Sequence, residues 1–429
     1  MISLEDAQQH ILAGIGPLSV ERVFLDEALG RVLAADVLAV RAQPPADNSA
    51  MDGYAVRWAD VSALASELGC GDDLHPTEHA GVRLTVAQAV QAGGWSDRPV
   101  GPGEAARIMT GAPLPPGDDL LVVMREWTDE GDDSVLIRQC GHGPGAHIRR
   151  AGEDIQEGEA YLLGGRTLQA PDLALLASQG VTQVDVRRAP IVGIVSTGDE
   201  VHDPGTPLPP GHIWNSNVSG LKALVREAGG IPRYLGIARD SHESLREVFG
   251  RIGGCDALVS IGGVSVGDFD FVKDVLEELG GEQTFWKVAM RPGKPNACGT
   301  VAGIPYFGLP GNPVSSMVSF LQYVRPALRR MQGSADLYLP TVDAVTTDEL
   351  RTRKGFLFLL RGVLSRGEGG YVVSTTGAQG SGIMRSLSLA NCLVAVPEDV
   401  DVVPAGARVR VQLLPWSHAG QPDPGLRLP

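Results

Sequence analysis

Apolar runs alternate with helical stripes of apolar residues between residues 190 and 332. The runs are continuous, which is typical of strands that are buried on both faces of a sheet. Strands are predicted at residues 191–196, 234–238, 257–261, 285–290 and 306–309. Between them, spacings such as Leu221, Leu224 and Ala228 put apolar side chains on one face of a helix. The alternation predicts a doubly wound, mostly parallel α/β sheet.

The rest of the chain has a different pattern. A helix is predicted from Ser3, whose side chain can cap it, and a second helix over residues 25–35. Elsewhere, short apolar runs separated by glycine and proline predict β structure. We therefore expect an α/β plus β multidomain chain, with a central doubly wound sheet domain, an inserted small β domain and a C-terminal β-barrel-like domain. The predicted parts are a discontinuous N-terminal linker domain (1–40 and 155–187), the inserted β domain (41–154), the α/β domain (188–332), the C-terminal β domain (333–415) and a tail (416–429).

Five turns rich in glycine and charged residues follow the predicted strands of the α/β domain. They are residues 196–200, 238–240, 262–268, 291–295 and 309–313. If the strands are parallel, all five turns meet at one edge of the sheet, where open α/β sheets bind ligands. Glycine lets backbone N–H groups approach an anion, basic side chains neutralise it, and carboxylates can hold a divalent cation. The expected ligand is a phosphate-bearing molecule with a metal ion.

Each of these residues also has an ordinary structural explanation. The glycines from Gly262 to Gly267 can seat a phosphate, or they can simply build a tight turn. Asp240 with Glu243 can cap a helix, although several carboxylates on one edge make a Mg²⁺ site credible. The carboxylates concerned are Asp199, Glu200, Asp240, Asp268 and Asp270.

Basic residues near the turns are open to two interpretations as well. Lys287 lies in a predicted strand and Arg291 directly follows it. The two are four apart and so share a face at a period of two, with Lys294 just beyond. Such residues are usually solvated, but their position beside the other turns favours anion binding. Arg149 and Arg150 form either a surface ion-pair patch with the acidic residues that follow or a clamp for an oxyanion.

Composition excludes several classes of function. With 51 acidic and 36 basic residues the formal net charge is −15, which argues against broad binding of nucleic acid or anionic membranes. No signal peptide or membrane-spanning run is predicted. Zinc-enzyme histidine spacings are not found. The five cysteines have no C-x-x-C pair and predict reduced thiols in a cytoplasmic protein.

Seven segments together resemble one family. They are residues 48–56, 107–113, 149–154, 196–200, 262–270, 292–295 and 309–313. In this order, over essentially the whole chain, they resemble the molybdopterin molybdenumtransferases, the bacterial relatives of the gephyrin E domain. The resemblance implies four subdomains, an elongated homodimer and the last step of molybdenum cofactor biosynthesis. In that step molybdate is inserted into adenylylated molybdopterin with release of AMP and with Mg²⁺ dependence.

The resemblance also implies roles for residues of this chain. The active cleft would lie between the α/β domain of one subunit and the inserted β domain of the other. Expected catalytic residues are Asp52, Thr110, Glu200, Asp240, Asp270, Lys287 and Arg291. Residues expected to bind the pterin nucleotide are Arg149, Asp154, Thr197, Gly198, Gly262, Gly263, Ser265, Gly267, Lys294, Pro310, Gly311 and Asn312. Residues expected to hold Mg²⁺ are Glu200, Asp240 and Asp270.

Two positions depart from the family pattern, and two rival functions stay open. Arg291 stands where lysine is more common, and His147 stands where asparagine is common. One rival is a molybdopterin adenylyltransferase on the same sheet, which would consume ATP. The other is a non-catalytic, gephyrin-like scaffold that binds a partner peptide, which would not need the charged turns. Candidate protein partners are molybdopterin adenylyltransferase and downstream cofactor-handling proteins.

Overall fold

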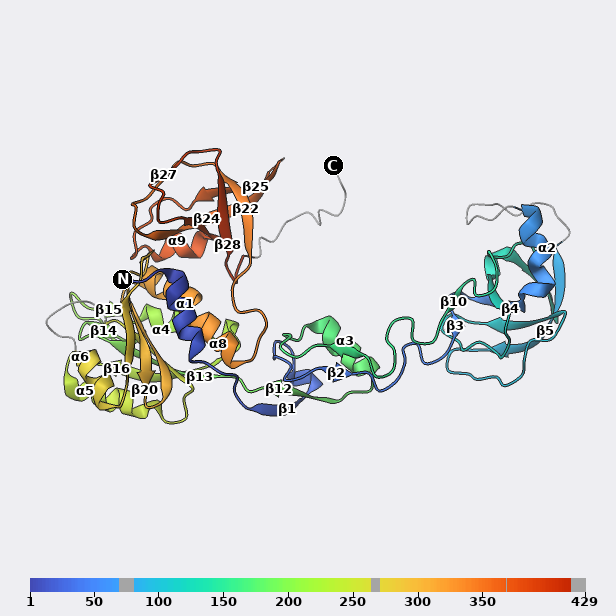
Figure 1. Ribbon diagram of the computed structural model, residues 1–429, viewed down its shortest axis with the longest axis horizontal. Helices are drawn as coiled ribbons and strands as arrows, with labels where there is room; N and C mark the ends of the chain where they lie inside the picture. Colours follow the sequence, from blue (N-terminus) through green and yellow to red (C-terminus); the bar gives the residue numbers. More distant parts are fainter. Residues whose placement is uncertain (69–80, 264–270, 368, 418–429) are drawn as a thin grey trace. The chain divides into compact units, whose positions relative to one another are not determined.

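The computed structural model describes residues 1–68, 81–263, 271–367 and 369–417, and the chain forms two compact units (Figure 1). The large unit comprises Met1–Ala35, Gly164–Ala177 and Val181–Pro429. The small unit comprises Asp36–Leu163 and Ser178–Gly180. The finer division into five parts stays a prediction. None of the helices in the described part of the chain has the length and apolar character that a membrane span requires.

The core of the large unit is a six-stranded sheet. Its strand order is β16 (Ile231–Ala238), β13 (Ile191–Thr197), β17 (Ala257–Ile261), β21 (Ile304–Leu309), β20 (Pro295–Val301) and β18 (Gln283–Lys287). The first four strands are parallel. Strand β20 is antiparallel to both of its neighbours, so β18 runs in the same direction as the parallel set. The predicted sheet class is confirmed.

Helices cover both faces of this sheet. They are α4 (Ser216–Glu227), α5 (His242–Phe249), α6 (Phe271–Glu278), α7 (Pro313–Ser319), the π-helix η4 (Phe320–Val324) and α8 (Arg325–Met331), with a 3-10 turn η3 (Gly250–Ile252). Buried residues of α4, α7 and α8 form one hydrophobic core with Ile194, whereas α5 and α6 form another with Val195. Because successive strand residues face opposite sides, the sheet is doubly wound.

The N-terminal helix is confirmed and the second predicted helix is wrong. Helix α1 (Leu4–Ala13) begins at Ser3, whose hydroxyl accepts a hydrogen bond from the N–H of Asp6 at 3.0 Å. At residues 25–35 there is only a 3-10 turn, η1 (Leu25–Glu27). Gly30 has φ +76°, and Leu33 pairs instead with Val186 in an isolated bridge. Backbone N–H groups of this segment therefore donate to carbonyls of other segments of the chain, such as that of Leu33 to Arg166, rather than to carbonyls within a helix.

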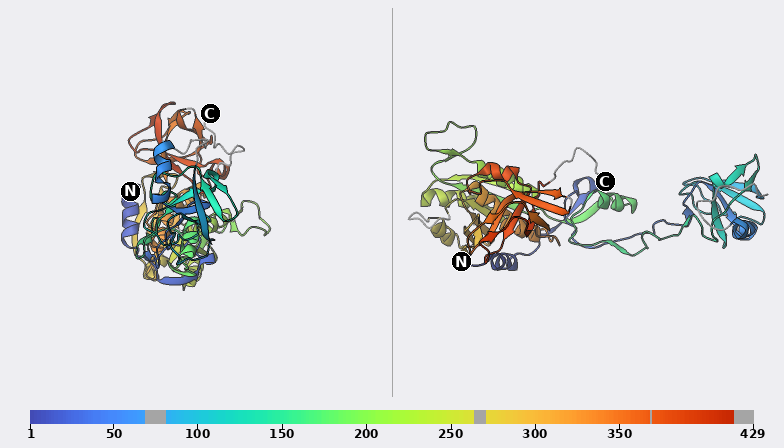
Figure 2. Two further views of the ribbon diagram at one scale, coloured as in Figure 1. Left: turned by 90° about the vertical axis from the view of Figure 1, so that its right-hand side faces the viewer. Right: turned by 90° about the horizontal axis from the view of Figure 1, so that it is seen from above.

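Shorter elements complete the non-barrel part of the large unit. They are β1 (Val20–Phe24) paired with β12 (Gln183–Arg187), helix α3 (Ala170–Ser178), and β14 (Val201–His202) paired with β15 (Ile213–Trp214). The segment that carries β14 and β15 extends from the body of the large unit as a long yellow-green loop (Figure 2). Strand β15 lies beside one of the cavities of the large unit.

The C-terminal part of the large unit is a closed barrel. Strands β22 (Thr341–Thr346), β25 (Gly370–Thr375), β24 (Leu357–Gly367), β26 (Cys392–Val396) and β28 (Arg408–Leu413) pair in a ring. Closure removes the exposed sheet edges, and the predicted barrel is confirmed. The remaining elements here are β19 (Met290–Arg291), β23 (Leu350–Arg351), helix α9 (Met384–Leu389) and β27 (Val402–Val403).

The small unit contains a six-stranded, mainly antiparallel sheet. Its order is β7 (Leu120–Met124), β4 (Gly53–Arg57), β6 (Glu104–Ile108), β5 (Val82–Val90), β9 (Ser134–Ile137) and β8 (Thr128–Glu130). Other elements are β2 (Val37–Leu38), β3 (Asn48–Ser49), helix α2 (Trp58–Leu68), η2 (Arg125–Trp127), β10 (Ile148–Arg149) and β11 (Ala160–Leu162). Sequence patterning predicted β structure here but missed α2.

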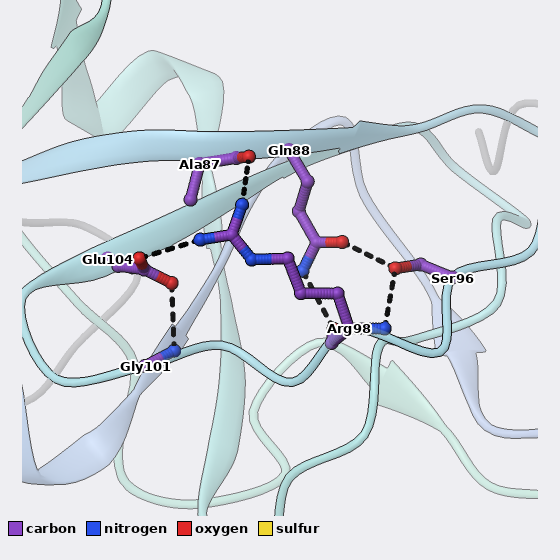
Figure 3. Close-up of polar contacts among 6 residues, drawn as sticks. All are labelled: Ala87, Gln88, Ser96, Arg98, Gly101 and Glu104. Carbon is purple, nitrogen blue, oxygen red and sulfur yellow. Dashed lines mark hydrogen bonds and ion pairs between the residues drawn. The ribbon is translucent and has the colours of Figure 1, made fainter.

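A polar network fastens the long loop between β5 and β6 (Figure 3). The Arg98 guanidinium donates to the carbonyl of Ala87 at 2.9 Å and to the Glu104 carboxylate at 2.8 Å. The other oxygen of Glu104 accepts from the N–H of Gly101 at 3.1 Å. These bonds hold a loop without regular secondary structure against the sheet.

Candidate active site

The five strands that precede the predicted turns all run in one direction. Strands β16, β13, β17 and β21 are parallel, and β18 shares their direction because β20 reverses between them. The described parts of the turns therefore lie along one edge of the sheet, which we call the rim. Two cavities open at this rim.

The first, here called the glycine cavity, has a volume of about 350 Å³. It lies at the ends of β13, β16 and β17 and at the start of α4. Residues from the sequence prediction that line it are Thr197, Gly198, Glu200, Asp240, Gly262, Gly263 and Gly311. The volume is within the usual range for small-molecule sites, roughly 300–1,000 Å³.

The glycines of this cavity are required by the backbone. Gly262 and Gly263 have φ of +87° and +67°. A Cβ at Gly262 would lie 2.7 Å from Thr197 Oγ1, and that hydroxyl itself donates to the carbonyl of Ile261 at 3.1 Å. The N–H of Gly262 donates to the carbonyl of Leu309 at 2.9 Å, so two rim turns are held together. A side chain would both strain the turn and fill the space that a ligand needs.

Carboxylates surround one side of the glycine cavity. Burial raises the pKa of the Asp240 carboxyl, and the negative charges of Asp199 and Glu200 add to that rise. The N–H of Asp240 donates to the Asp199 carboxylate at 3.3 Å. The prediction that Asp240 and Glu243 cap α5 is wrong, because Ser241 is the N-cap and its hydroxyl accepts from the N–H of Ser244 at 3.3 Å. The Asp240 carboxylate is therefore not used as a cap.

Oxygen ligands of this kind are what Mg²⁺ prefers, and Glu200 and Asp240 supply two carboxylates at the cavity wall. Among the described residues, however, no three His, Cys, Asp or Glu side chains are grouped so as to hold a metal ion. Asp268 and Asp270 lie outside the described residues, as do Ser265 and Gly267.

The second cavity, here called the barrel cavity, has a volume of about 630 Å³ and lies between the rim and the C-terminal barrel. Predicted site residues that line it are Arg291, Lys294, Pro310 and Asn312. The Arg291 guanidinium carbon and Lys294 Nζ lie 4.8 and 5.6 Å from the ring centroid of Phe356. This aromatic ring holds both cations at the cavity wall.

Arg361 is a lining residue that the sequence prediction missed. Its side chain is 1% exposed, and burial lowers its pKa to about 10. It donates to Ser386 Oγ and to the carbonyl of Gly380, both at 3.1 Å. No carboxylate of the described residues forms an ion pair with it. An unpaired buried charge is costly, so an anion in the barrel cavity would complete this site. The signal in the sequence was a single arginine directly after the apolar run 356–360.

Lys287 and Arg291 do not share a strand face as predicted. Strand β18 ends at Lys287, and Met290 and Arg291 form β19, which pairs with β24 of the barrel. The strand is interrupted because the N-terminal segment bonds to the backbone here. The N–H of Ile2 donates to the carbonyl of Lys287, and the carbonyl of Ile2 accepts from the N–H of Ala289. Of the described residues, Arg291 and Lys294 line the barrel cavity, whereas Lys287 lines neither cavity.

The remaining predicted residues lie in the small unit. Asp52 Oδ1 accepts from the N–H and the hydroxyl of Thr110 at 2.7 and 2.8 Å, and these bonds lower the Asp52 pKa. Arg149 is exposed on β10, and Asp154 is exposed with its N–H bonded to the carbonyl of Gln43. The structure thus joins Asp52 with Thr110 by direct contact.

Arg150 and His147 give two further details of this region. Arg150, rather than Arg149, forms the ion pair, at 2.5 Å to Asp47. His147 has φ +54°, a conformation in which asparagine is favoured over most residues. His147 therefore replaces the asparagine that is common in the family at a position where the backbone has a positive φ.

Three family models match the chain in order. The MoeA N-terminal region (domain I and II) matches residues 2–180, the probable molybdopterin binding domain matches 193–330, and the MoeA C-terminal region (domain IV) matches 343–414. Among solved structures, the molybdopterin biosynthesis MoeA protein of Pyrococcus horikoshii superimposes with a TM-score of 0.81 at 28% identity. That match covers 96% of this chain and 100% of the other.

Curated relatives are similar over their whole length. Molybdopterin molybdenumtransferase 2 of Mycobacterium tuberculosis is 40% identical, over 96% of this chain and 99% of the relative. Molybdopterin molybdenumtransferase of Haemophilus influenzae is 34% identical, over 97% and 99%. The resemblance predicted from the sequence is confirmed: the chain belongs to the molybdopterin molybdenumtransferase family.

Proposed function

We propose that this chain is an enzyme that inserts molybdenum from molybdate into adenylylated molybdopterin and releases AMP. The observation that carries the proposal is the presence of two differently lined cavities on one rim of one sheet. The reaction has two anionic substrates, a pterin nucleotide and an oxyanion. Two adjoining sites with different chemistry meet that requirement.

The glycine cavity suits the phosphoanhydride of the pterin nucleotide. Gly262 and Gly263 bring backbone close to the cavity without side chains, and Asn215 starts α4 in its wall. Backbone N–H groups and a helix N-terminus are favourable surroundings for phosphate. Water attack on the anhydride would give AMP and the phosphate ester of the pterin. The two pterin sulfurs would bind molybdenum, and an oxo ligand of molybdate would take up two protons and leave as water.

The barrel cavity suits molybdate. Arg291, Lys294 and Arg361 line it, and Arg361 has its guanidinium already desolvated. Cations fixed before the substrate arrives stabilise negative charge without reorganisation. They would offset the repulsion between the oxyanion and the nucleotide.

Mg²⁺ dependence is part of the proposal. Glu200 and Asp240 line the glycine cavity, and with Asp270 they are the residues that would hold the ion. A bound Mg²⁺ would neutralise charge on the phosphate oxygens. The donor chemistry fits, because the carboxylates of Glu200 and Asp240 both line this cavity, and Mg²⁺ takes one or two carboxylates together with phosphate oxygens and water.

A homodimer and a cytoplasmic location complete the proposal. In the dimer, Asp52, Thr110, Arg149 and Asp154 of one subunit would complete the cleft of the other. Molybdopterin adenylyltransferase would supply the substrate, and cofactor-handling proteins would receive the product.

The test is to incubate the chain with adenylylated molybdopterin, molybdate and Mg²⁺, then to measure AMP and the activation of an apo-molybdoenzyme. Omission of molybdate should abolish activation. A second reaction with ATP and molybdopterin tests the adenylyltransferase alternative: ATP consumption there, without activation in the first reaction, would contradict the proposal. A gephyrin-like scaffold without catalysis would give neither product.

Single variants then test individual residues. Lys294→Ala should slow AMP release, whereas Lys273→Ala, an exposed lysine on α6 paired with Glu277, should not. Lys287→Ala tests a residue that lines neither cavity. An unchanged rate of AMP release would show that Lys287 takes no part in the reaction.

A further inference from the structure

The turn that carries Glu200 leaves strand β13 beside the end of strand β16. Thr197 is paired with Ala238 in the parallel register, so the residues that follow them, Gly198 and Arg239, are neighbours at the rim. The N–H of Gly198 donates to the carbonyl of Ala238 at 3.1 Å. This backbone bond joins the two turns that carry the carboxylates of the glycine cavity.

The carboxylate of Glu200 lies directly over Gly198. A Cβ built on this glycine would be 2.5 Å from Glu200 Oε2 and 3.0 Å from Oε1. Gly198 has φ +128°, a conformation that glycine adopts without strain. The position of the Glu200 carboxylate therefore depends on the backbone at Gly198.

The side chain of Arg239 holds this backbone from the neighbouring turn. Its Nη1 donates to the carbonyl of Asp199 at 2.8 Å, and the carbonyl of Gly198 lies 3.5 Å from the same nitrogen. The N–H of Arg239 donates to Ser244 Oγ on helix α5 at 2.9 Å. The guanidinium thus bonds to backbone oxygens, and it forms no ion pair with a carboxylate of the described residues. Its contacts are those of a group that fixes a turn.

Tyr234 of strand β16 holds the other end of the same turn. Its hydroxyl donates to Asp203 Oδ1 at 2.9 Å and accepts from Asn215 Nδ2 at 3.2 Å. Lys222 of helix α4 lies over the ring of Tyr234, with Nζ 4.5 Å from the ring centroid. The segment 198–203 is therefore attached at each end, by a side chain from β16 or from the turn that follows it.

We propose that Arg239 and Tyr234 are positioning residues that hold the Glu200 carboxylate where it can share a Mg²⁺ ion with Asp240. The inference rests on the proposed function, in which these two carboxylates bind the ion. Mg²⁺ demands near-ideal octahedral geometry, so a small displacement of one carboxylate lowers its affinity. Arg239 and Tyr234 act through the backbone of residues 198–203 and contact neither the ion nor the reacting atoms.

Arg239→Met separates a positioning role from a charge effect, because the two predict opposite changes. Arg239 acts electrostatically on Asp240, so loss of its positive charge should by itself tighten the binding of Mg²⁺. Loss of its bond to the turn should weaken that binding, and we expect the dissociation constant for Mg²⁺ to rise roughly 3- to 10-fold. Calorimetric titration of the full-length chain with Mg²⁺ alone, without nucleotide, measures this constant.

Tyr234→Phe removes only the hydroxyl and changes no charge. The dissociation constant for Mg²⁺ should rise roughly 2- to 5-fold, the effect of one lost hydrogen bond. The rate of AMP release at saturating Mg²⁺ should stay within about twofold of the wild-type rate, because a positioning residue affects the occupancy of the ion rather than the reacting atoms. A group that contacts the substrate would instead lower this maximal rate.

Two control variants remove similar bonds elsewhere in the α/β sheet domain. Arg251 Nη1 donates to the carbonyl of Leu235 in β16 at 3.0 Å, but it lies after helix α5, whereas Arg239 precedes that helix. The hydroxyl of Tyr306 is bonded to Ser260 Oγ at 2.6 Å within the sheet. Arg251→Met and Tyr306→Phe should lower the thermal unfolding midpoint and leave Mg²⁺ binding unchanged.

Several outcomes would overturn the inference. They are no detectable Mg²⁺ binding by the wild type, tighter or unchanged Mg²⁺ binding in Arg239→Met, unchanged Mg²⁺ binding in Tyr234→Phe, and equal losses in the control variants. Cofactor formation by the wild type is measured separately. A chain that forms cofactor while Arg239→Met and Tyr234→Phe bind Mg²⁺ normally would retain the proposed function and lose this inference. A chain that forms no cofactor would lose the proposed function, whatever its variants do with Mg²⁺.

Discussion

The glycine cavity and the barrel cavity share one rim but have opposite chemical character. The glycine cavity is lined by glycines and by the carboxylates of Glu200 and Asp240. The barrel cavity is lined by Arg291, Lys294 and Arg361. An anion in the first would be met by backbone N–H groups and by a cation bound with it, whereas an anion in the second would be met by fixed side-chain charges. In the proposed function, one sheet edge would therefore hold two anionic substrates and keep them apart.

The largest effect is expected at Gly262, where the backbone and the neighbouring Thr197 leave no room for a side chain. Gly262→Ala would place a Cβ 2.7 Å from Thr197 Oγ1 at φ +87°. The displaced turn should lower the rate of AMP release roughly 100-fold, because small misplacements at reacting groups have effects of that size. Gly303→Ala is the control, since its φ is also positive but its Cβ would have no neighbour within 4 Å. Equal losses of activity in the two variants would show that strain, rather than the cavity, is responsible.

The second-largest effect is expected at Arg361, where a substitution should weaken molybdate binding without lowering the stability of the fold. Arg361→Met removes a buried charge that has no carboxylate partner, so the thermal unfolding midpoint should be kept or raised. The affinity for molybdate should fall roughly 10- to 100-fold, the usual loss for a hydrogen bond to a charged group. Both quantities can be measured on the same samples by calorimetry. Arg410→Met, at an exposed arginine paired with Asp343, should leave molybdate binding unchanged. A destabilised Arg361→Met protein with normal molybdate affinity would contradict this assignment.

A smaller effect is expected at Arg291. Lysine would keep the charge and the contact with Phe356 but lose the planar, two-pronged donor geometry. Arg291→Lys should therefore raise the KM for molybdate only a few-fold, by about 1 kcal/mol of binding free energy. A loss as large as that of Arg291→Ala would mean that guanidinium geometry, rather than charge, is what the cavity needs.

The smallest effect concerns pH and the acidic side of the glycine cavity. Burial, together with the nearby charges of Asp199 and Glu200, raises the folded-state pKa of Asp240. The folded chain therefore holds this proton more tightly than the unfolded chain, and the stabilisation is lost as pH rises through the folded pKa. Asp240→Asn should unfold at a higher temperature than the wild type at pH 7, and the gap should close toward pH 3. Mg²⁺ should reduce this difference in unfolding temperature at pH 7. A difference that changes with neither pH nor Mg²⁺ would argue against a raised pKa of Asp240.

Sequence patterns predicted the sheet and the rim because both follow from local, repeated signals. Continuous apolar strands and glycine turns placed β13, β17 and β21 and the turns behind them. The same reasoning failed where distant chain decides the structure. Residues 25–35 have helical spacing, but Leu33 pairs with Val186 instead. Asp240 looks like a helix cap, but Ser241 takes that place.

The candidate site was predictable to a similar degree. The glycines that line the glycine cavity could be picked out from the sequence because glycine marks special backbone conformations. Arg361 was missed because nothing in its local sequence shows which cavity it lines. The environment of Arg361 comes from Ser386 and Gly380, which only the closure of the barrel brings near.

Strand β19 gives the barrel cavity a mechanical property. Arg291 is paired with Phe358 in the hydrogen-bond ladder of the barrel, although it follows a strand of the α/β sheet by only a few residues. A rotation of the barrel would carry this cation along, whereas Lys294, directly before strand β20 of the sheet, would stay with the rim. The distance between the two charges would therefore depend on the orientation of the barrel. The size of the oxyanion that fits between them would depend on it as well.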